Sequence, residues 1–331
     1  MALNILYFDL ESPDANAVPE FDPDAAPNVD ETPADRLSPM LFQVLMDTNA
    51  HILQNISELR EVPDKCLLFA LPLNDVGMNK EYTMLLARLR REPHLLDGCT
   101  AGIIVDGPSE LYTTPVAAEF AMAITMAGGS LIGHPLVEAT GSLSAFAAQA
   151  EAQSCSREDA YLQAIRELAG RLEASSFPRK ALPNLLTLCT ASQDQAATEA
   201  LWSHLAPQLA GFCQAEECCL DQESLEELCA SVQKADAVLL LCTNRNGLLP
   251  PEATALIHRL TGEQFENKPV FAAVVSPCSG GDMLARQLLT ALNLNGPFRL
   301  PGEFALLQTG SEPDEDDLDE FVQSIRQTLC Q

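Results

Sequence analysis

Basic residues are scarce in this sequence. Its 331 residues include 19 Lys and Arg against 47 Asp and Glu, which gives a formal net charge of −28. A chain with this charge repels polyanions, so nucleic acid and anionic membrane surfaces are poor partners for it. The composition therefore predicts no nucleic-acid partner and no membrane partner.

The sequence also lacks a basic leader and any long apolar run. The first residues, MALNILYFDLESPDA, carry no Lys or Arg and are already acidic at Asp9, unlike the positive start of a secretory signal peptide. No apolar stretch reaches the roughly 18 residues that a membrane helix needs. We therefore expect a cytoplasmic protein in which most of the 11 cysteines are reduced and buried.

Signature motifs of several enzyme classes are missing. The patterns GxSxG, GxxxxGK[ST] and HExxH do not occur, which argues against an α/β-hydrolase, a P-loop nucleotide hydrolase and a metalloprotease. A cysteine-rich stretch formed by Cys213, Cys218, Cys219 and Cys229 contains no CxxC pair, and two of its members are adjacent. No histidine lies near another histidine or near a cysteine pair. We therefore expect no bound metal.

What the sequence does contain is a long segment that occurs twice. Residues 67–89, LLFALPLNDVGMNKEYTMLLARL, return as residues 239–260, LLLCTNRNGLLPPEATALIHRL. The later segments GIIVDGPSE and LVEATGS are answered by AAVVSPCSGG and FALLQTGS, so that the three matches have offsets of 171, 170 and 169 residues. Solenoid repeats are only ~20 to 50 residues long, so this repeat predicts a tandem duplication of a whole domain. We place the first domain at residues 1–177 and the second at residues 178–331.

The start of the first copy is irregular. A strand is expected at residues 4–10, followed by a loop at residues 11–38 whose Pro, Asp and Ala content favours poor order. Ser38 and Pro39 then have the residue types of a helix start, an N-cap followed by proline. The expected apolar face of this helix is formed by Leu41, Val44, Leu45, Ile52 and Ile56.

Strand and helix patterns alternate through the rest of both copies. In the first copy we expect strands at 66–71, 102–105 and 135–139, helices at 81–90 and 115–126, and one long or broken helix at 142–175. In the second copy we expect strands at 184–189, 237–242, 270–275 and 304–308, and helices at 196–209, 224–232, 252–260, 283–292 and 318–330. Such alternation predicts two tandem α/β domains, each a doubly wound parallel sheet covered by helices on both faces.

Ligands of doubly wound sheets bind beyond the carboxyl ends of the strands. Three loops of the second copy lie there, and they are rich in hydroxyl, amide and glycine residues that suit a phosphate or an aromatic ring. The candidate cofactor-binding residues are Thr190, Ser192, Gln193, Gln195 and Thr198 in the first loop, Thr243, Asn244, Arg245, Asn246 and Gly247 in the second, and Ser276, Cys278, Ser279, Gly280 and Gly281 in the third.

These segments resemble the flavodoxin-like NAD(P)H-dependent FMN reductase family. TLCTASQDQAAT stands where that family has its phosphate loop, ADAVLLLCTNRNGLLPPEATALIHRL is similar to its second flavin-contacting segment, and VVSPCSGGDMLARQLLTAL resembles its third. The resemblance covers residue 184 to the C-terminus and, more weakly, residues 67–142. It implies flavodoxin-like domains and an oxidoreductase that holds FMN, takes hydride from NADH or NADPH and passes electrons to a small-molecule or protein acceptor. It also implies a homodimer or an internal pseudo-dimer.

Two departures from the family leave an alternative open. The phosphate-loop segment carries Asp194 and lacks the arginine that is usual there. The alternative is a non-catalytic flavodoxin-like interaction module that has lost flavin binding.

The first copy departs further from the pattern of that family. Its first strand leads into the acidic loop, and its other two candidate loops carry Asp75 and Asp106, so a phosphate dianion would be repelled. If the protein binds FMN, the sequence predicts one FMN, in the second copy.

Overall fold

The chain forms two compact units. The N-terminal unit comprises Met1–Gly129 and Pro135–Ser175, and the C-terminal unit comprises Ser130–His134 and Ser176–Gln331. The predicted boundary at residues 177 and 178 falls in a stretch that the structure does not describe, so it stays a prediction. The computed structural model describes residues 3–7, 33–48, 50–53, 56–61, 66–176, 180–190, 195–244, 248–276, 281–309 and 314–330.

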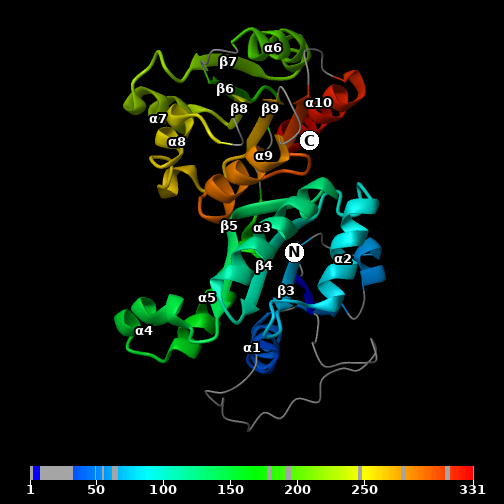
Figure 1. Ribbon diagram of the computed structural model, residues 1–331, viewed down its shortest axis with the longest axis vertical. Coiled ribbons are helices and arrows are strands. Elements are labelled where there is room, and N and C mark those ends of the chain that lie inside the picture. The colour runs from blue at the N-terminus through cyan, green and yellow to red at the C-terminus, as the bar shows by residue number, and fades with distance from the viewer. Residues whose placement is uncertain are drawn as a thin grey trace. The chain divides into compact units, whose positions relative to one another are not determined.

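The N-terminal unit contains a five-stranded sheet in the order β2-β1-β3-β4-β5 (Figure 1). Its strands are β1 (Leu3–Tyr7), β2 (His51–Leu53), β3 (Cys66–Pro72), β4 (Thr100–Gly107) and β5 (Ser130–Thr140). Its helices are α1 (Pro33–Asp47), α2 (Lys80–Arg91), α3 (Glu110–Met126), α4 (Ala147–Gln153) and α5 (Arg157–Ala174), with short 3-10 helices η1 (Ile56–Glu61) and η2 (Ser144–Phe146).

The C-terminal unit contains a second five-stranded sheet in the order β10-β9-β8-β6-β7. Its strands are β6 (Asn184–Cys189), β7 (Gln214–Cys219), β8 (Ala237–Thr243), β9 (Val270–Ser276) and β10 (Ala305–Thr309). Its helices are α6 (Gln195–Leu209), α7 (Leu225–Lys234), α8 (Pro251–Ile257), α9 (Gly281–Leu289) and α10 (Glu315–Cys330), with a 3-10 helix η3 (Glu263–Phe265) and a π-helical turn η4 (Thr290–Leu294).

Both sheets have the same strand order. Numbered from the first strand of its own unit, each runs 2-1-3-4-5, which is the flavodoxin-like order. The paired strands β1 to β4 and β6 to β10 are parallel. The prediction of two doubly wound, flavodoxin-like α/β domains is therefore confirmed.

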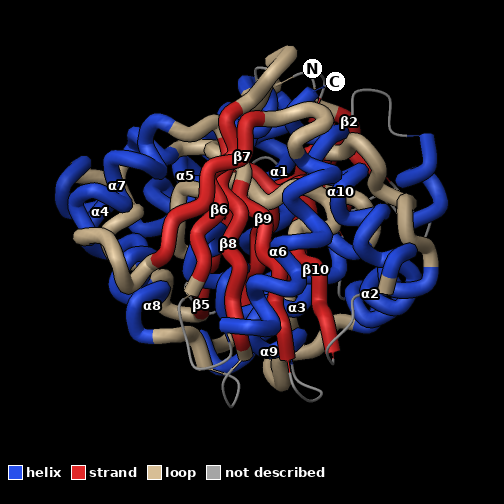
Figure 2. The backbone as a smooth tube through the Cα atoms, turned by 90° about the horizontal axis from the view of Figure 1, so that it is seen from above, coloured by secondary structure: helices blue, strands red, loops and turns tan. Residues whose placement is uncertain are grey.

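Apolar helices cover the C-terminal sheet. Figure 2 shows its five strands side by side, with α6 and α10 across one face. Leu201 and Leu205 of α6 and Phe321 and Ile325 of α10 form one buried cluster with side chains of the strands, among them Phe271. Every residue of β8 and β9 is buried, as it is in β3 and β4, which explains why these central strands are continuously apolar in the sequence.

The first helix begins earlier than predicted. It starts at Pro33 and ends at Asp47, with Pro39 inside it. The buried Leu37 draws the preceding turn into the helix, so the start at Ser38 was wrong, as was the loop prediction for residues 33–38. Residues 11–32 of that loop lie outside the described residues.

Two strands were absent from the sequence prediction. Ile52, assigned to the first helix, lies in β2, and Ile56 begins η1, so this part of the prediction was wrong. β7 lies in the cysteine-rich stretch that gave no strand signal. Both strands stand at the same outer position of their sheets. There, one side has no neighbouring strand among the described residues, and the side chains are largely exposed.

The segment predicted as one long or broken helix at residues 142–175 is broken. It folds as η2, α4 and α5. Ser154 ends α4 in the left-handed conformation, and Ser156 opens α5 with a capping box to Asp159.

A short piece of β5 belongs to the C-terminal unit. Within Ser130–His134, the backbone of Leu131 exchanges two hydrogen bonds with Leu300, at 2.7 and 3.0 Å. A Cβ atom on Gly133 would lie 2.0 Å from the carbonyl oxygen of Pro297, so only glycine fits there. The C-terminal unit is therefore not made only of residues that follow the predicted boundary.

Candidate functional site

Buried polar side chains gather at the carboxyl ends of three strands of the C-terminal unit. Thr190 follows β6, Thr243 ends β8 with Asn244 directly after it, and Ser276 ends β9. All four are at most 5% exposed. Since these strands are parallel neighbours, their carboxyl ends lie along one edge of the sheet, which is where the sequence placed the site.

Hydrogen bonds join these strand ends. The Nδ2 atom of Asn244 donates to Oγ of Ser276 at 3.0 Å, and the Asn244 backbone N–H donates to the carbonyl of Val275 at 2.7 Å. Thr190 donates its backbone N–H to Leu241 at 3.0 Å, and its Oγ1 accepts from the Thr243 N–H at 3.4 Å. The turns that leave β6, β8 and β9 therefore start from fixed, mutually bonded positions.

Some of the remaining candidate residues belong to described helices, and the others lie in loops that the structure does not describe. Gln195 is the first residue of α6, Gly281 is the first residue of α9, and Thr198 is buried in α6. The N-terminal end of an α-helix attracts anions, so this end of α6 suits a phosphate. Outside the described residues lie Ser192, Gln193, Arg245, Asn246, Gly247, Cys278, Ser279 and Gly280. Their roles stay predictions.

The equivalent positions of the N-terminal unit are apolar. Leu73 directly follows β3 as Asn244 follows β8. The Leu73 N–H donates to the carbonyl of Asp106 at 2.7 Å, and this hydrogen bond is equivalent to the one from the Asn244 N–H to the carbonyl of Val275. Gly107 ends β4 as Ser276 ends β9. The bonded Asn244 and Ser276 pair is thus replaced by leucine and glycine. A Cβ atom on Gly107 would lie 2.8 Å from Thr113 and 3.3 Å from Leu73, so this spot is already filled.

A buried ion pair occupies the N-terminal unit at this edge. Arg36 of α1 bonds both carboxylate oxygens of Asp106, with Nε at 2.8 Å from Oδ2. Its other donors reach the carbonyls of Gly141 at 2.9 Å and Thr140 at 3.1 Å. Asp106 is fully buried and Arg36 is 8% exposed. The sequence showed Asp106 only as a charge that repels phosphate, and gave no indication that Arg36 neutralises it.

The two charges shift each other's ionisation. Burial raises the pKa of Asp106, and the hydrogen bonds and charge of Arg36 only partly offset this. Burial lowers the pKa of Arg36, but its bonds to Asp106 and the charge of that carboxylate outweigh the effect, so the net shift is upward. Burial and the nearby Asp106 also raise the pKa of the Tyr161 hydroxyl. Arg36, Asp106 and Tyr161 therefore form a buried group of coupled ionisable side chains at this edge of the N-terminal unit.

The cysteines near β7 are poorly suited to bind a metal as thiolates. Cys218 and Cys219 are consecutive residues of the strand, so their side chains point to opposite faces of the sheet. Burial, with the neighbouring Glu223, raises the pKa of Cys218 to about 11. Burial and Glu217, which accepts a hydrogen bond from Cys189 at 3.4 Å, raise the pKa of Cys189 as well.

We expect slow alkylation of Cys218 as a consequence. A thiol with a pKa near 11 is about a hundredfold less ionised at pH 8 than an ordinary thiol of pKa near 8.5, and the thiolate is the reactive form. Site-resolved iodoacetamide labelling of the folded protein should show this delay relative to the unfolded chain. Labelling should accelerate in Glu223→Gln, because the carboxylate that raises this pKa is gone. Equal rates in folded and unfolded protein would contradict the assignment.

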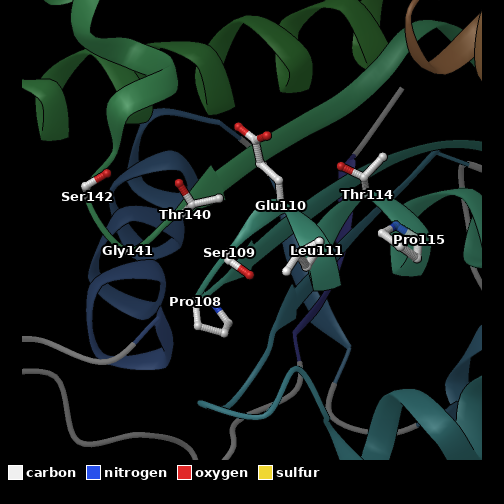
Figure 3. Close-up of a pocket in the computed structure, with 9 residues that line it drawn as sticks. All are labelled: Pro108, Ser109, Glu110, Leu111, Thr114, Pro115, Thr140, Gly141 and Ser142. Carbon is white, nitrogen blue, oxygen red and sulfur yellow. The ribbon is translucent and has the colours of Figure 1, made fainter.

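A cavity opens in the N-terminal unit beside the ion pair. Its volume is about 820 Å³, and it lies between the turn after β4, the first turn of α3 and the end of β5 (Figure 3). Hydroxyls of Ser109 and Thr140, the carboxylate of Glu110 and the side chain of Leu111 line it. No Lys or Arg is among the lining residues.

No helix in the described ranges is both long and apolar enough to cross a lipid bilayer.

Comparison with known proteins finds a family similarity in one part of the chain. Residues 165–311 match the family model of NADPH-dependent FMN reductase. This confirms the resemblance of that part to the flavodoxin-like NADPH-dependent FMN reductase family, and it supports FMN with NAD(P)H as electron donor. A comparison with curated proteins finds no significant match.

Several solved structures are similar to part of the chain. A short-chain flavodoxin associated with a non-canonical PDU bacterial microcompartment is 13% identical, covers 44% of this chain and 99% of its own, and has a TM-score of 0.35. An NADH:FMN oxidoreductase named EMOB, in its apo form, is 12% identical over 44% of this chain and 88% of its own, with a TM-score of 0.36. The NAD(P)H:acceptor oxidoreductase FerB from Paracoccus denitrificans is 15% identical over 44% of this chain and 99% of its own, with a TM-score of 0.32.

Proposed function

We propose that the half of this chain that matches the NADPH-dependent FMN reductases is an oxidoreductase domain that binds one FMN and takes hydride from NADH or NADPH. The observation that carries this proposal is the buried hydrogen bond between Asn244 and Ser276, at the ends of β8 and β9. Buried polar side chains cost free energy unless they are hydrogen-bonded, and this bonded pair directly precedes two loops of the candidate site. At the equivalent described positions of the N-terminal unit, Leu73 and Gly107 do not form such a pair.

The chain's own residues would hold the cofactor at three places. We assign the phosphate to Thr190, Ser192, Gln193, Gln195 and Thr198, near the start of α6, where backbone N–H groups and the helix dipole favour an anion. We assign the flavin ring to the loops after β8 and β9, whose first residues are fixed by the bonded pair. When bound, FMN supplies the redox chemistry, while the protein positions it and keeps competing groups away.

The N-terminal unit holds no FMN under this proposal. Its position equivalent to Val275 is Asp106, which Arg36 neutralises, and Leu73 and Gly107 replace the polar pair. The shared strand order and the sequence repeat support the proposal that the two units arose by duplication, with domains at residues 1–177 and 178–331. We propose further that the protein is cytoplasmic, that it pairs as a homodimer or through its two copies as a pseudo-dimer, and that it reduces a small-molecule or protein acceptor.

Reconstitution with FMN tests this function directly. Protein that has been incubated with FMN and desalted should retain a flavin absorption band corresponding to one FMN per chain, and should oxidise NADPH or NADH in the presence of an acceptor. Two FMN per chain would contradict the assignment to a single unit. Colourless protein whose unfolding temperature does not respond to FMN would instead support a non-catalytic flavodoxin-like interaction module.

Arg245 is the residue of the second loop with the clearest expected effect. An arginine that pairs with a phosphate or a nicotinamide cofactor contributes a charge-assisted contact, so Arg245→Ala should weaken binding of FMN or of NADPH about tenfold or more. Arg259→Ala, at an exposed position just after α8, is the matched control and should leave both affinities unchanged. If Arg245→Ala also changes neither affinity, Arg245 is not part of the site.

A further inference from the structure

Four large apolar side chains are exposed together on the N-terminal unit. Val76 and Met78 lie in the turn after β3 and are 61% and 62% exposed, and Leu111 and Tyr112 in the first turn of α3 are 83% and 40% exposed. A Cβ atom on Gly77 would lie 2.2 Å from the Tyr112 ring, which shows that the turn and the helix are in contact. We call these four side chains the apolar patch. Exposed apolar groups that gather in this way are typical of an interaction surface.

The turn holds its part of the patch in a fixed shape. The Oδ1 atom of Asn74 accepts from the N–H groups of Val76 at 3.1 Å and of Met78 at 2.9 Å. The Asn74 N–H in turn donates to the Met78 carbonyl at 3.0 Å, and Gly77 has the positive φ that this turn requires. Val76 and Met78 are therefore directed outward by a bonded turn.

Two exposed carboxylates, Asp75 and Glu110, stand directly beside residues of the patch in the sequence, and one exposed cation, Lys80, lies two residues after Met78. Asp75 and Glu110 are exposed, and neither forms an ion pair in the part of the chain that the structure describes. Glu110 and Leu111 both line the cavity of about 820 Å³ (Figure 3). Two arginines donate to backbone carbonyls of the cavity lining. Arg36 donates to Thr140 and Gly141, and its charge is neutralised by the buried Asp106. Arg157 donates from Nη1 to Ser142, and the acidic residues 158 and 159 follow it directly.

Charge selects among the possible occupants. A second copy of this chain is equally acidic, so a homodimer would form through another surface, and nucleic acid or an anionic membrane would be repelled from this one in the same way. A phosphate-bearing cofactor meets Asp75 and Glu110 and no cation on the cavity lining. What fits is a ligand that combines apolar groups with positive charge.

We propose that the apolar patch and the adjoining cavity form a docking surface for a segment of a partner protein that carries apolar side chains together with Lys or Arg. The apolar side chains of the partner cover Val76, Met78 and Leu111, while its cation pairs with Glu110 at the mouth of the cavity. This inference goes beyond the proposed flavin chemistry and does not depend on it, because every residue that carries it belongs to the N-terminal unit.

A pair of synthetic peptides tests the surface on the full chain. The probe is a short amphipathic peptide of Leu and Lys, and its counterpart has Glu in place of every Lys. Calorimetric titration should show saturable binding of the Lys peptide, weakening as salt is added, and no binding of the Glu peptide. Hydrogen exchange should show protection of the turn after β3 and of the start of α3.

Matched variants decide whether binding is specific. The double variant Met78→Ser/Leu111→Ser should weaken binding about tenfold or more, and Glu110→Gln should weaken it and reduce its salt dependence. Met126→Ser, at a methionine that is also exposed and lies at the far end of α3, should have no effect. The proposal is overturned if the Lys peptide does not bind, if all variants bind it alike, or if the Glu peptide binds equally. A dimer of the chain that dissociates in the double variant would overturn it in favour of a second copy.

Discussion

Replacing Arg36 by methionine is expected to lower the free energy of unfolding of the N-terminal unit by about 3–5 kcal/mol, the usual loss when a buried ion pair loses one partner. The size of this effect follows from burial. Asp106 is fully buried, and its carboxylate receives two bonds from Arg36. Without the guanidinium, a charge remains in the interior, and the carbonyls of Thr140 and Gly141 also lose their donor.

The chain provides an internal reference for this measurement. Its single tryptophan, Trp202, lies on α6 in the C-terminal unit, so tryptophan fluorescence follows that unit while circular dichroism follows both. When Arg36→Met is unfolded with denaturant, part of the circular-dichroism transition should therefore move to a lower denaturant concentration. The fluorescence transition, which follows only the C-terminal unit, should stay in place. If both signals match those of the unmodified protein, the ion pair contributes nothing to stability.

The loss should depend on pH. In Arg36→Met, burial raises the pKa of Asp106 with no cation to offset it. A carboxyl group whose pKa is higher in the folded state stabilises the fold fully below its unfolded pKa, near 3.9, and loses that contribution as the pH rises through the folded value. The variant should therefore be closer to the unmodified protein at pH 4 to 5 than at pH 7.

A second substitution should recover most of the stability. The position of Asp106 is taken by Val275 in the C-terminal sheet, so the double variant Arg36→Met/Asp106→Val removes both charges and places at position 106 a side chain that the other sheet accommodates there. Exchanging a buried ion pair for apolar side chains of similar volume is often neutral or stabilising. A double variant as unstable as Arg36→Met would show that the loss comes from packing and not from the unpaired charge.

The two sheets show which strands a sequence can predict. β3, β4, β8 and β9 are buried on both faces, so their apolar runs stand out, and their repetition 169 to 171 residues apart marks them as equivalent. The edge strands β2 and β7 gave no such signal. QAEECC has acidic and thiol side chains because it is partly exposed, and it is a strand because its backbone pairs with β6. Tertiary pairing of that kind leaves little trace in a local pattern.

The candidate site was predictable to a similar extent. The alternation of strands and helices places the ends of β6, β8 and β9 at one edge, and Thr190, Asn244 and Ser276 are indeed brought together there. Arg36 was missed because it lies 70 residues from Asp106, in a stretch whose composition resembles a loop. The one sequence feature that could have drawn attention to Arg36 is that it is the first Lys or Arg of an acidic chain.

The second large effect is expected from making the C-terminal site resemble the N-terminal one. Asn244→Leu combined with Ser276→Gly gives the residues that stand at the equivalent positions after β3 and at the end of β4. Because the bonded pair fixes the start of both loops to which we assign the flavin, we expect FMN affinity to fall about tenfold to a hundredfold, which corresponds to the loss of one or two buried hydrogen bonds. Equilibrium dialysis or flavin fluorescence quenching measures this directly.

Controls separate loss of the site from loss of the fold. Because both partners are removed together, no buried donor or acceptor is left alone within the pair, so the free energy of unfolding should fall less than in Ser276→Gly alone. Trp202 fluorescence checks this in the same unit. Ser276→Gly alone leaves the Asn244 amide without this acceptor and should be less stable than the double variant. An FMN affinity that is unchanged in the double variant, with the fold intact, would contradict the placement of the flavin at the ends of β8 and β9.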